Sequence, residues 1–267
     1  MEREQQLVTR IGTYTRDRIE VRGLDLCQNV VGTMSLTQFL LFHWTGQLPK
    51  PEQVAMADAL LVSLVEHGLT HHVIAARLTY DAAPEALQGA VASGILGAGS
   101  VFLGAMEDAA RLVQSEVAAW REQGDDLAAR AERVVEEYLE SGRRVPGFGH
   151  PVHRPEDPRA VRLLELARQY GFYGDHCRFV AMLGEALDRR AGEHVTMNVM
   201  SAFAGILSDM GFDWRVVKGF ALVSRTIGLI GHLYEEMRRP MARELWRLVE
   251  GAVRYVPEQP GDEAALA

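Results

Sequence analysis

The sequence has little cysteine and no long uncharged apolar run. Cys27 and Cys177 are its only 2 cysteines and lie far apart, so they make neither a disulfide framework nor a cysteine metal site. The start, M-E-R-E-Q-Q, is charged and lacks the apolar stretch of a secretion signal. The most apolar segment, Phe220 to Tyr234, contains Arg225 and is too short to span a bilayer. We therefore expect a cytoplasmic protein without a membrane association.

The chain also lacks an excess of positive charge. It carries 28 Lys and Arg against 36 Asp and Glu, a formal net charge of −8. A general attraction to nucleic acid is therefore not expected, and an anionic ligand must be held by local arginines. The 267 residues, 48% of them hydrophobic, suffice for one large or two small domains with a real core.

Strand-forming patterns are confined to the beginning of the chain. Residues 7–21 are rich in β-branched side chains of alternating polarity, which predicts a hairpin or short extended arm. After that, apolar residues recur at spacings of three and four, the period of a helix with one buried face. A first helix is capped by Ser35 and ended by Gly46; further helices are expected near residues 52–66, 72–80, 84–96, 101–122, 126–141, 158–170, 173–190, 198–210, 214–237 and 240–254. The expected fold class is all-α.

A loop that cannot be helical interrupts this pattern, V-P-G-F-G-H-P-V-H-R-P-E-D-P-R at residues 145–159. Its 2 glycines and 4 prolines fix a shaped connection, and the glycines let backbone approach a ligand closely. A histidine can titrate near neutral pH, and His150 has Arg154 and Arg159 near it in the sequence to supply positive charge. Such a loop suits an anionic substrate whose reaction moves a proton. The alternative is a solvated connection between helices with an incidental histidine.

The P-G-F-G-H run and the D-P-R triplet resemble the glycine–histidine loop of the citrate synthase superfamily. The resemblance implies that His150 contacts the oxygen on the carbon that is attacked or released, and that Arg159 binds a substrate carboxylate. It also implies that backbone before the histidine binds coenzyme A. We assign this contact to Val145, Pro146, Gly147, Phe148 and Gly149, and we add Arg154, which follows the histidine, to the expected coenzyme A residues.

A second segment, L-F-H-W-T-G-Q-L-P at residues 41–49, also resembles the superfamily, so the resemblance extends over about residues 13–256. It implies an all-α, two-domain citrate synthase-like fold with a short N-terminal extended arm. The large domain would comprise residues 1–99 and 206–267, and the small domain residues 100–205, with the active site in the cleft. The chain length is nearer to citryl-CoA lyases and to the citryl-CoA-cleaving module of ATP-citrate lyase than to full-length citrate synthases.

Three further residues match family motifs. His67, in E-H-G-L-T, matches a histidine that holds the keto-acid or citrate moiety, although a histidine there can also simply complement a helix dipole. Arg225, in S-R-T-I-G, matches an arginine that binds a substrate carboxylate; an internal carboxylate partner is the alternative. Arg239, before Pro240, matches an arginine that reaches the active site of the neighbouring subunit, which implies a homodimer. The alternative is a basic residue that complements the dipole at a surface helix end.

Two positions depart from citrate synthase. Phe102 stands where citrate synthases have a histidine that polarises the acetyl thioester, and the ATP-citrate lyase module also has phenylalanine there. Met200, in N-V-M, stands where the family has an aspartate that moves the proton at the acetyl carbon. A methionine neither accepts nor donates a proton. Asp209 is about 13 Å further along the helix, too far to substitute, and Glu193 and His194 serve only if their loop folds back.

Three interpretations follow from these residues. The first is a citryl-CoA lyase that cleaves citryl-CoA to acetyl-CoA and oxaloacetate. His150 or His67 would take the hydroxyl proton, and Arg159, Arg225 and a partner's Arg239 would hold the carboxylates. The second is an enzyme of the same fold acting on another acyl-CoA, and the third is a catalytically impaired module that binds a dicarboxylate or acyl-CoA. Coenzyme A is the only cofactor expected, as part of the substrate and without a metal.

Overall fold

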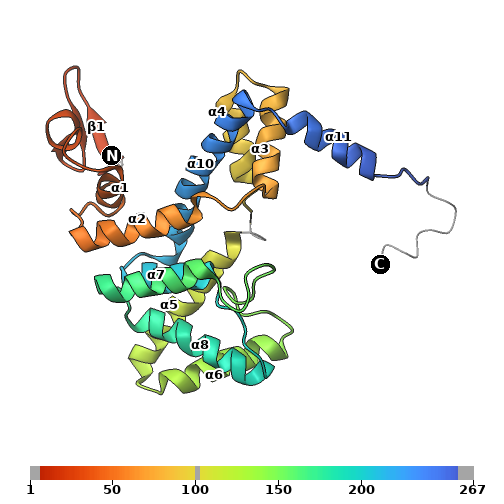
Figure 1. The fold of residues 1–267 in the computed structure, drawn as a ribbon. Helices are drawn as coiled ribbons and strands as arrows, with labels where there is room; N and C mark the ends of the chain where they lie inside the picture. The colour runs from red at the N-terminus through yellow and green to blue at the C-terminus, as the bar shows by residue number, and fades with distance from the viewer. Residues whose placement is uncertain (1–6, 100–102, 258–267) are drawn as a thin grey trace, which may run out of the picture. The chain divides into compact units, whose positions relative to one another are not determined.

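The structure, a computed structural model, describes residues 7–99 and 103–257 (Figure 1). Its elements are β1 (Gly12–Tyr14), β2 (Ile19–Val21), β3 (Leu24–Asp25), the π-helical turn η1 (Leu26–Val30), α1 (Leu36–Thr45), α2 (Pro51–Val65), α3 (His71–Ala82), α4 (Leu87–Leu96), α5 (Ala105–Gln123), α6 (Leu127–Glu140), α7 (Pro158–Tyr170), α8 (Asp175–Ala191), α9 (Val199–Asp209), α10 (Trp214–Arg238) and α11 (Ala242–Ala252). The predicted all-α fold class with a short extended arm is confirmed. The turn η1 was not predicted.

The N-terminal arm is a small antiparallel sheet in the order β1-β2-β3. Gly12 pairs with Val21, and Val21 pairs in turn with Leu24. Arg22, in the turn after β2, donates from Nε to the carbonyl of His43 at 2.9 Å and from Nη2 to that of Trp44 at 3.1 Å. These carbonyls belong to the last turn of α1, which lacks helical partners for them. The arginine therefore fastens the arm to α1.

The chain divides into two compact units, of which the first comprises residues 1–64 and 103–221. Its main core lies where α5, α6 and α8 pack, around Val117, Val135 and Phe179, all fully buried. Helix α9 packs against α5, α7 and α8, and buried residues run along most of its length from Val199 to Ser208. Apolar and small residues all round α9 explain its central position.

The second unit comprises residues 65–102 and 222–267. Helices α3 and α4 pack together, with Ala76, Ala90 and Leu233 fully buried in its core. Close packing explains why residue 228 is a glycine, because an added Cβ would lie 2.0 Å from the carbonyl oxygen of Val65. These units group residues differently from the family division into 1–99 with 206–267 and 100–205. That division stays a prediction.

Helix α10 is long and apolar enough to be compared with a membrane-spanning helix. It has 25 residues and a window of mean hydropathy 1.3, so by length and composition alone it could cross a membrane. A buried core helix passes the same test, and 44% of that window is buried inside the protein. Arg225 and Glu236, both buried on this helix, would be costly in a hydrocarbon environment. These charges favour a core helix.

Candidate functional site

The glycine–histidine loop is bonded to the segment that leads into α9. Gly149 donates its N–H to the carbonyl of Thr196 at 2.7 Å, and Asn198 donates its own N–H to Gly147 at 3.1 Å. The Asn198 amide also donates to the Gly149 carbonyl at 2.9 Å, and Ser201 Oγ donates to Gly147 at 2.7 Å. At Gly147, φ is +88° and an added Cβ would lie 2.2 Å from Ser201 Oγ. Only glycine fits this position.

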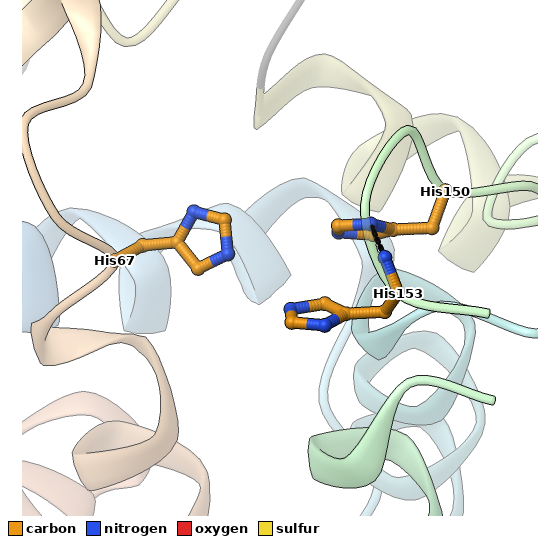
Figure 2. Close-up of side chains that lie close together, drawn as sticks. All are labelled: His67, His150 and His153. Carbon is orange, nitrogen blue, oxygen red and sulfur yellow. Dashed lines mark hydrogen bonds between the residues drawn. The ribbon is translucent and has the colours of Figure 1, made fainter.

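His150 is held by the backbone that follows it. Its Nδ1 accepts N–H groups from Val152 at 3.1 Å and from His153 at 2.9 Å, the latter drawn as a dashed line in Figure 2. The neutral ring therefore carries its hydrogen on Nε2, which makes that atom a donor. Burial lowers the pKa of His150, and His153 and Arg159 lower it further, while the carboxylate of Asp157 opposes them. A neutral imidazole with a fixed N–H donor is the result.

His153 lies beside His150 on the same loop. The two ring centroids are 4.4 Å apart with an interplanar angle of 33°, and both side chains are half-buried (Figure 2). His153 was not among the residues selected from the sequence. The signal was present as the second histidine of H-P-V-H, three residues after the first.

Arg159 is paired with Asp157, two residues before it. Arg159 Nε donates to Oδ1 at 3.0 Å and Nη2 donates to Oδ2 at 2.9 Å. Asp157 is fully buried, caps α7 and accepts the N–H of Val199 at 3.0 Å. Burial alone would raise the pKa of Asp157, but the hydrogen bonds and charge of Arg159 and the Val199 N–H lower it. Nη1 and one N–H of Nη2 stay available, so the outer edge of the guanidinium can still bind a carboxylate.

A pocket of about 420 Å³ opens on one side of this loop. Its lining includes the predicted coenzyme A contacts Val145, Phe148, Gly149 and Arg154, but not Pro146 or Gly147. Apolar walls are added by Leu139, Leu187, Ala191 and Val195, and positive charge by Arg143, Arg144 and Arg190. The structure thus brings four arginines to one pocket, three of them not selected from the sequence. The G-R-R-V run before the loop was the available signal.

Met200 lies half-buried in the first turn of α9, where Asn198 Oδ1 accepts its N–H at 2.9 Å. The acids and the histidine considered as substitutes are elsewhere. Asp209, at the far end of α9, accepts N–H groups of Gly174 and Cys177 and so caps α8. His194 Nδ1 lies 2.7 Å from Asp188 Oδ2, whose carboxylate raises the pKa of His194. Phe102 lies outside the described residues.

His67, Arg225 and Arg239 belong to the second unit. His67 is exposed in the turn between α2 and α3. Glu66 organises this turn, because its Oε1 accepts the N–H groups of His67 at 2.9 Å and Gly68 at 2.5 Å. Burial raises the pKa of Glu66, yet these bonds and a contact with His232 bring it below its usual value. Glutamate, standing where the family has aspartate, shapes the turn that presents His67.

Arg225 is buried on α10, near a neutral histidine of α3. Burial lowers the pKa of His72 to about 4, and the charge of Arg225 is the next cause. Thr70 Oγ1 lies 3.0 Å from His72 Nδ1 and gives it a partner. A fixed cation here makes a second positive charge on His72 unfavourable.

Arg239 is exposed at the end of α10, and a buried arginine holds the neighbouring turn. Arg77, with 0% of its surface exposed, donates from Nη1 to Glu236 Oε2 at 2.7 Å and from Nη2 to Glu235 Oε2 at 2.5 Å. Glu236 Oε1 accepts the N–H groups of Met241 at 2.8 Å and Ala242 at 2.9 Å, where α11 begins. This network fixes the R-R-P turn that carries Arg239. It was not predicted.

The family model for the C-terminal domain of citrate synthase matches residues 6–248. The chain belongs to the citrate synthase family. The structure of citryl-CoA lyase from Hydrogenobacter thermophilus is similar to it, with a TM-score of 0.84 and 36% identity, covering 95% of this chain and 96% of that one. The chain is thus a citryl-CoA lyase-like member of this enzyme superfamily, as its motifs implied.

Other relatives are longer. The "Putative citrate synthase 2" of Mycobacterium tuberculosis is 29% identical over 242 residues, which are 90% of this chain and 59% of that protein. An ATP citrate lyase of Methanosaeta concilii, solved in complex with (3S)-citryl-CoA, has a TM-score of 0.77 at 21% identity and covers 100% of this chain but 44% of that one. At 21% identity this likeness is evidence for a shared fold alone. The chain spans 59% of the length of the first curated relatives that it matches.

Proposed function

We propose that the protein cleaves citryl-CoA to acetyl-CoA and oxaloacetate. The observation that carries this proposal is the similarity to the citryl-CoA lyase of Hydrogenobacter thermophilus, which extends over 95% of this chain at 36% identity. The glycine–histidine loop, whose geometry suits a ligand oxygen, adds to it. We place the reaction in the cytoplasm, where free thiols such as Cys27 and Cys177 persist.

His150 supplies a hydrogen bond in this proposal. Its Nδ1 is occupied by two backbone N–H groups, so Nε2–H points a donor at the oxygen on the carbon that is released. As the bond to the acetyl unit breaks, negative charge on this oxygen is drawn into the carbonyl of oxaloacetate. A preorganised donor stabilises that charge. In this tautomer His150 does not take the hydroxyl proton, which leaves that step to His67 or to another base.

Coenzyme A occupies the arginine pocket. Arg143, Arg144, Arg154 and Arg190 face its phosphates, and Phe148 with the neighbouring aliphatic side chains covers its apolar parts. Guanidinium groups suit phosphate because they offer several directed donors. Local charge of this kind overcomes the repulsion from a chain of net charge −8. No metal is required in this scheme, which stays a prediction.

The citryl carboxylates bind the outer edge of the Arg159 guanidinium and Arg225 of the same chain. They also bind the partner subunit's Arg239, so the working form is a homodimer. The α11 surface supports a second copy. Trp246, Val249 and Val253 are 61%, 62% and 68% exposed on or just after this helix and form an apolar stripe, and Leu248 of the same helix is 62% exposed as well. Burial of such a stripe against another chain is favourable.

Release of acetyl-CoA from citryl-CoA tests the proposal. The native protein should turn over, and His150→Ala should lose ~10²–10³-fold in rate through loss of the oxyanion donor. Arg144→Ala should raise the KM for citryl-CoA, with little effect on kcat. A native protein that binds citryl-CoA in calorimetry but releases no acetyl-CoA would overturn the lyase activity.

Met200 favours a second candidate function. A half-buried methionine in place of the acid suits a catalytically impaired module that binds citrate or an acyl-CoA, or an enzyme for another acyl-CoA. Binding without turnover of citryl-CoA would support the binding module. Turnover of a different acyl-CoA ester would support the other enzyme.

A further inference from the structure

Cleavage of citryl-CoA requires a proton to move from oxygen to carbon. The tertiary hydroxyl loses its proton, the electron pair of that bond forms the ketone, and the breaking carbon–carbon bond leaves its pair on the acetyl carbon as a thioester enolate. The enolate then takes up a proton to give the methyl group of acetyl-CoA. One group that first accepts and then returns a proton balances the reaction without another reactant. Met200 cannot be that group.

The loop that carries His153 is tied on both sides to the segment before Met200. Upstream of His153, the backbone of Gly149 bonds to Thr196 and Asn198. Downstream, Thr196 Oγ1 donates to the Pro155 carbonyl at 2.7 Å, and Asp157 Oδ2 accepts the Val199 N–H at 3.0 Å. His153 therefore belongs to a loop held against the N-terminus of α9, where the family has its acid.

The pairing with His150 separates the roles of the two imidazoles. The rings are 4.4 Å apart, and the backbone N–H of His153 helps to fix His150 as an Nε2–H donor. Because two backbone N–H groups hold His150 as a neutral donor, the second imidazole of the pair, His153, is the candidate for the proton step.

We propose that His153 is a further catalytic residue, the base that accepts the hydroxyl proton of citryl-CoA and the acid that returns it to the acetyl carbon. This inference rests on the proposed function. The neutral imidazole of His153 becomes imidazolium as the carbon–carbon bond breaks, and it is neutral again after the enolate is protonated. It thereby does the work that the family assigns to the aspartate replaced by Met200.

Chemical rescue tests this role. The acetyl-CoA release assay is run on the native protein, His153→Ala and His153→Gln, with calorimetric titration of coenzyme A and citrate alongside. Both variants should lose ~10²–10⁴-fold in cleavage rate while both ligands still bind. Added imidazole should restore part of the rate in His153→Ala, where the side chain leaves room, and not in His153→Gln. His43→Gln is the matched control, since this histidine lies on α1, away from the loop in sequence and not among the site residues, and it should keep the native rate.

The outcomes distinguish this inference from the proposed function. A native protein without citryl-CoA cleavage would overturn both. An active native protein whose two His153 variants stay within threefold of its rate would overturn only the role of His153. Loss of rate together with loss of ligand binding in both variants would make His153 structural and also overturn it. A His67→Ala variant is assayed in parallel, and rescue of this variant by imidazole without rescue of His153→Ala would give the proton step to His67 instead.

Discussion

Replacement of Arg77 by methionine should destabilise the protein strongly, because it breaks a buried ion pair. Methionine fills much of the same volume but removes the guanidinium from a fully buried position. Glu236 then keeps a negative charge with only 3% of its side chain exposed. Glu235 is 49% exposed, so water solvates its charge and the loss of its partner changes the free energy of unfolding little.

The magnitude follows from these exposures. Breaking a buried ion pair by removing one partner costs ~3–5 kcal/mol, because the remaining charge is buried without compensation. Glu236 still accepts the N–H groups of Met241 and Ala242, which offsets part of this cost. We therefore expect a loss near the lower end, ~3 kcal/mol in the free energy of unfolding. Arg77→Lys should recover part of it, since lysine restores the charge but not the forked geometry.

Urea denaturation followed by circular dichroism measures this loss. The matched control is Arg243→Ala, because Arg243 also joins α11 to α3, through Asp81 at 3.0 Å, but its side chain is 73% exposed. Exposed pairs contribute ~0–1 kcal/mol. An Arg77→Met protein within ~1 kcal/mol of the native protein, or no less stable than the control, would contradict a buried ion pair that stabilises the fold.

Arg225→Ala should weaken citrate binding by ~1.5–3 kcal/mol, measured by calorimetry, and unchanged affinity would contradict a carboxylate contact. Analytical ultracentrifugation should find a mass near twice 29.6 kDa, whereas a fully active monomer at micromolar concentration would exclude the shared site. Met200→Asp should leave citryl-CoA cleavage unimproved if His153 carries the proton; a gain of ~10²-fold or more would return that role to the acid. The stability of the native protein should fall as the pH drops from about 6.5 to about 4, because the unfolded chain protonates His72 while the folded protein, with the His72 pKa at about 4, does not. Urea midpoints across that range measure the fall, and His72→Gln should flatten it.

The helices could be predicted from the sequence because local signals mark them. Ser35 accepts the N–H of Gln38 and caps α1, as its place before an apolar run predicts. Asp157 and Pro158 likewise begin α7 inside the D-P-R triplet. Helix bounds agree with the expected ranges to within a few residues, since apolar spacing decides which face is buried.

The buried polar contacts could not be predicted in the same way. Arg77 and Glu236 are 159 positions apart, and neither position stands out from the charged residues of an amphipathic helix. The orientation of His150 depends on two backbone N–H groups aimed at Nδ1, which residue types do not encode. The sequence places Asp157 and Arg159 two positions apart, but it does not reveal that their side chains pair with each other. The roles of the site residues themselves stay predictions.

The bonds that join Gly147 to Ser201 and Asn198 have a consequence for engineering. The loop and the beginning of α9 come from two distant stretches of the chain but fit together closely. An added Cβ at residue 147 would lie 2.2 Å from Ser201 Oγ, so the two segments form one structural unit. Transplanting residues 145–159 alone into a relative would import one half of a matched interface. A chimaera that keeps its shape must carry residues 196–201 as well, so these two segments should be exchanged together.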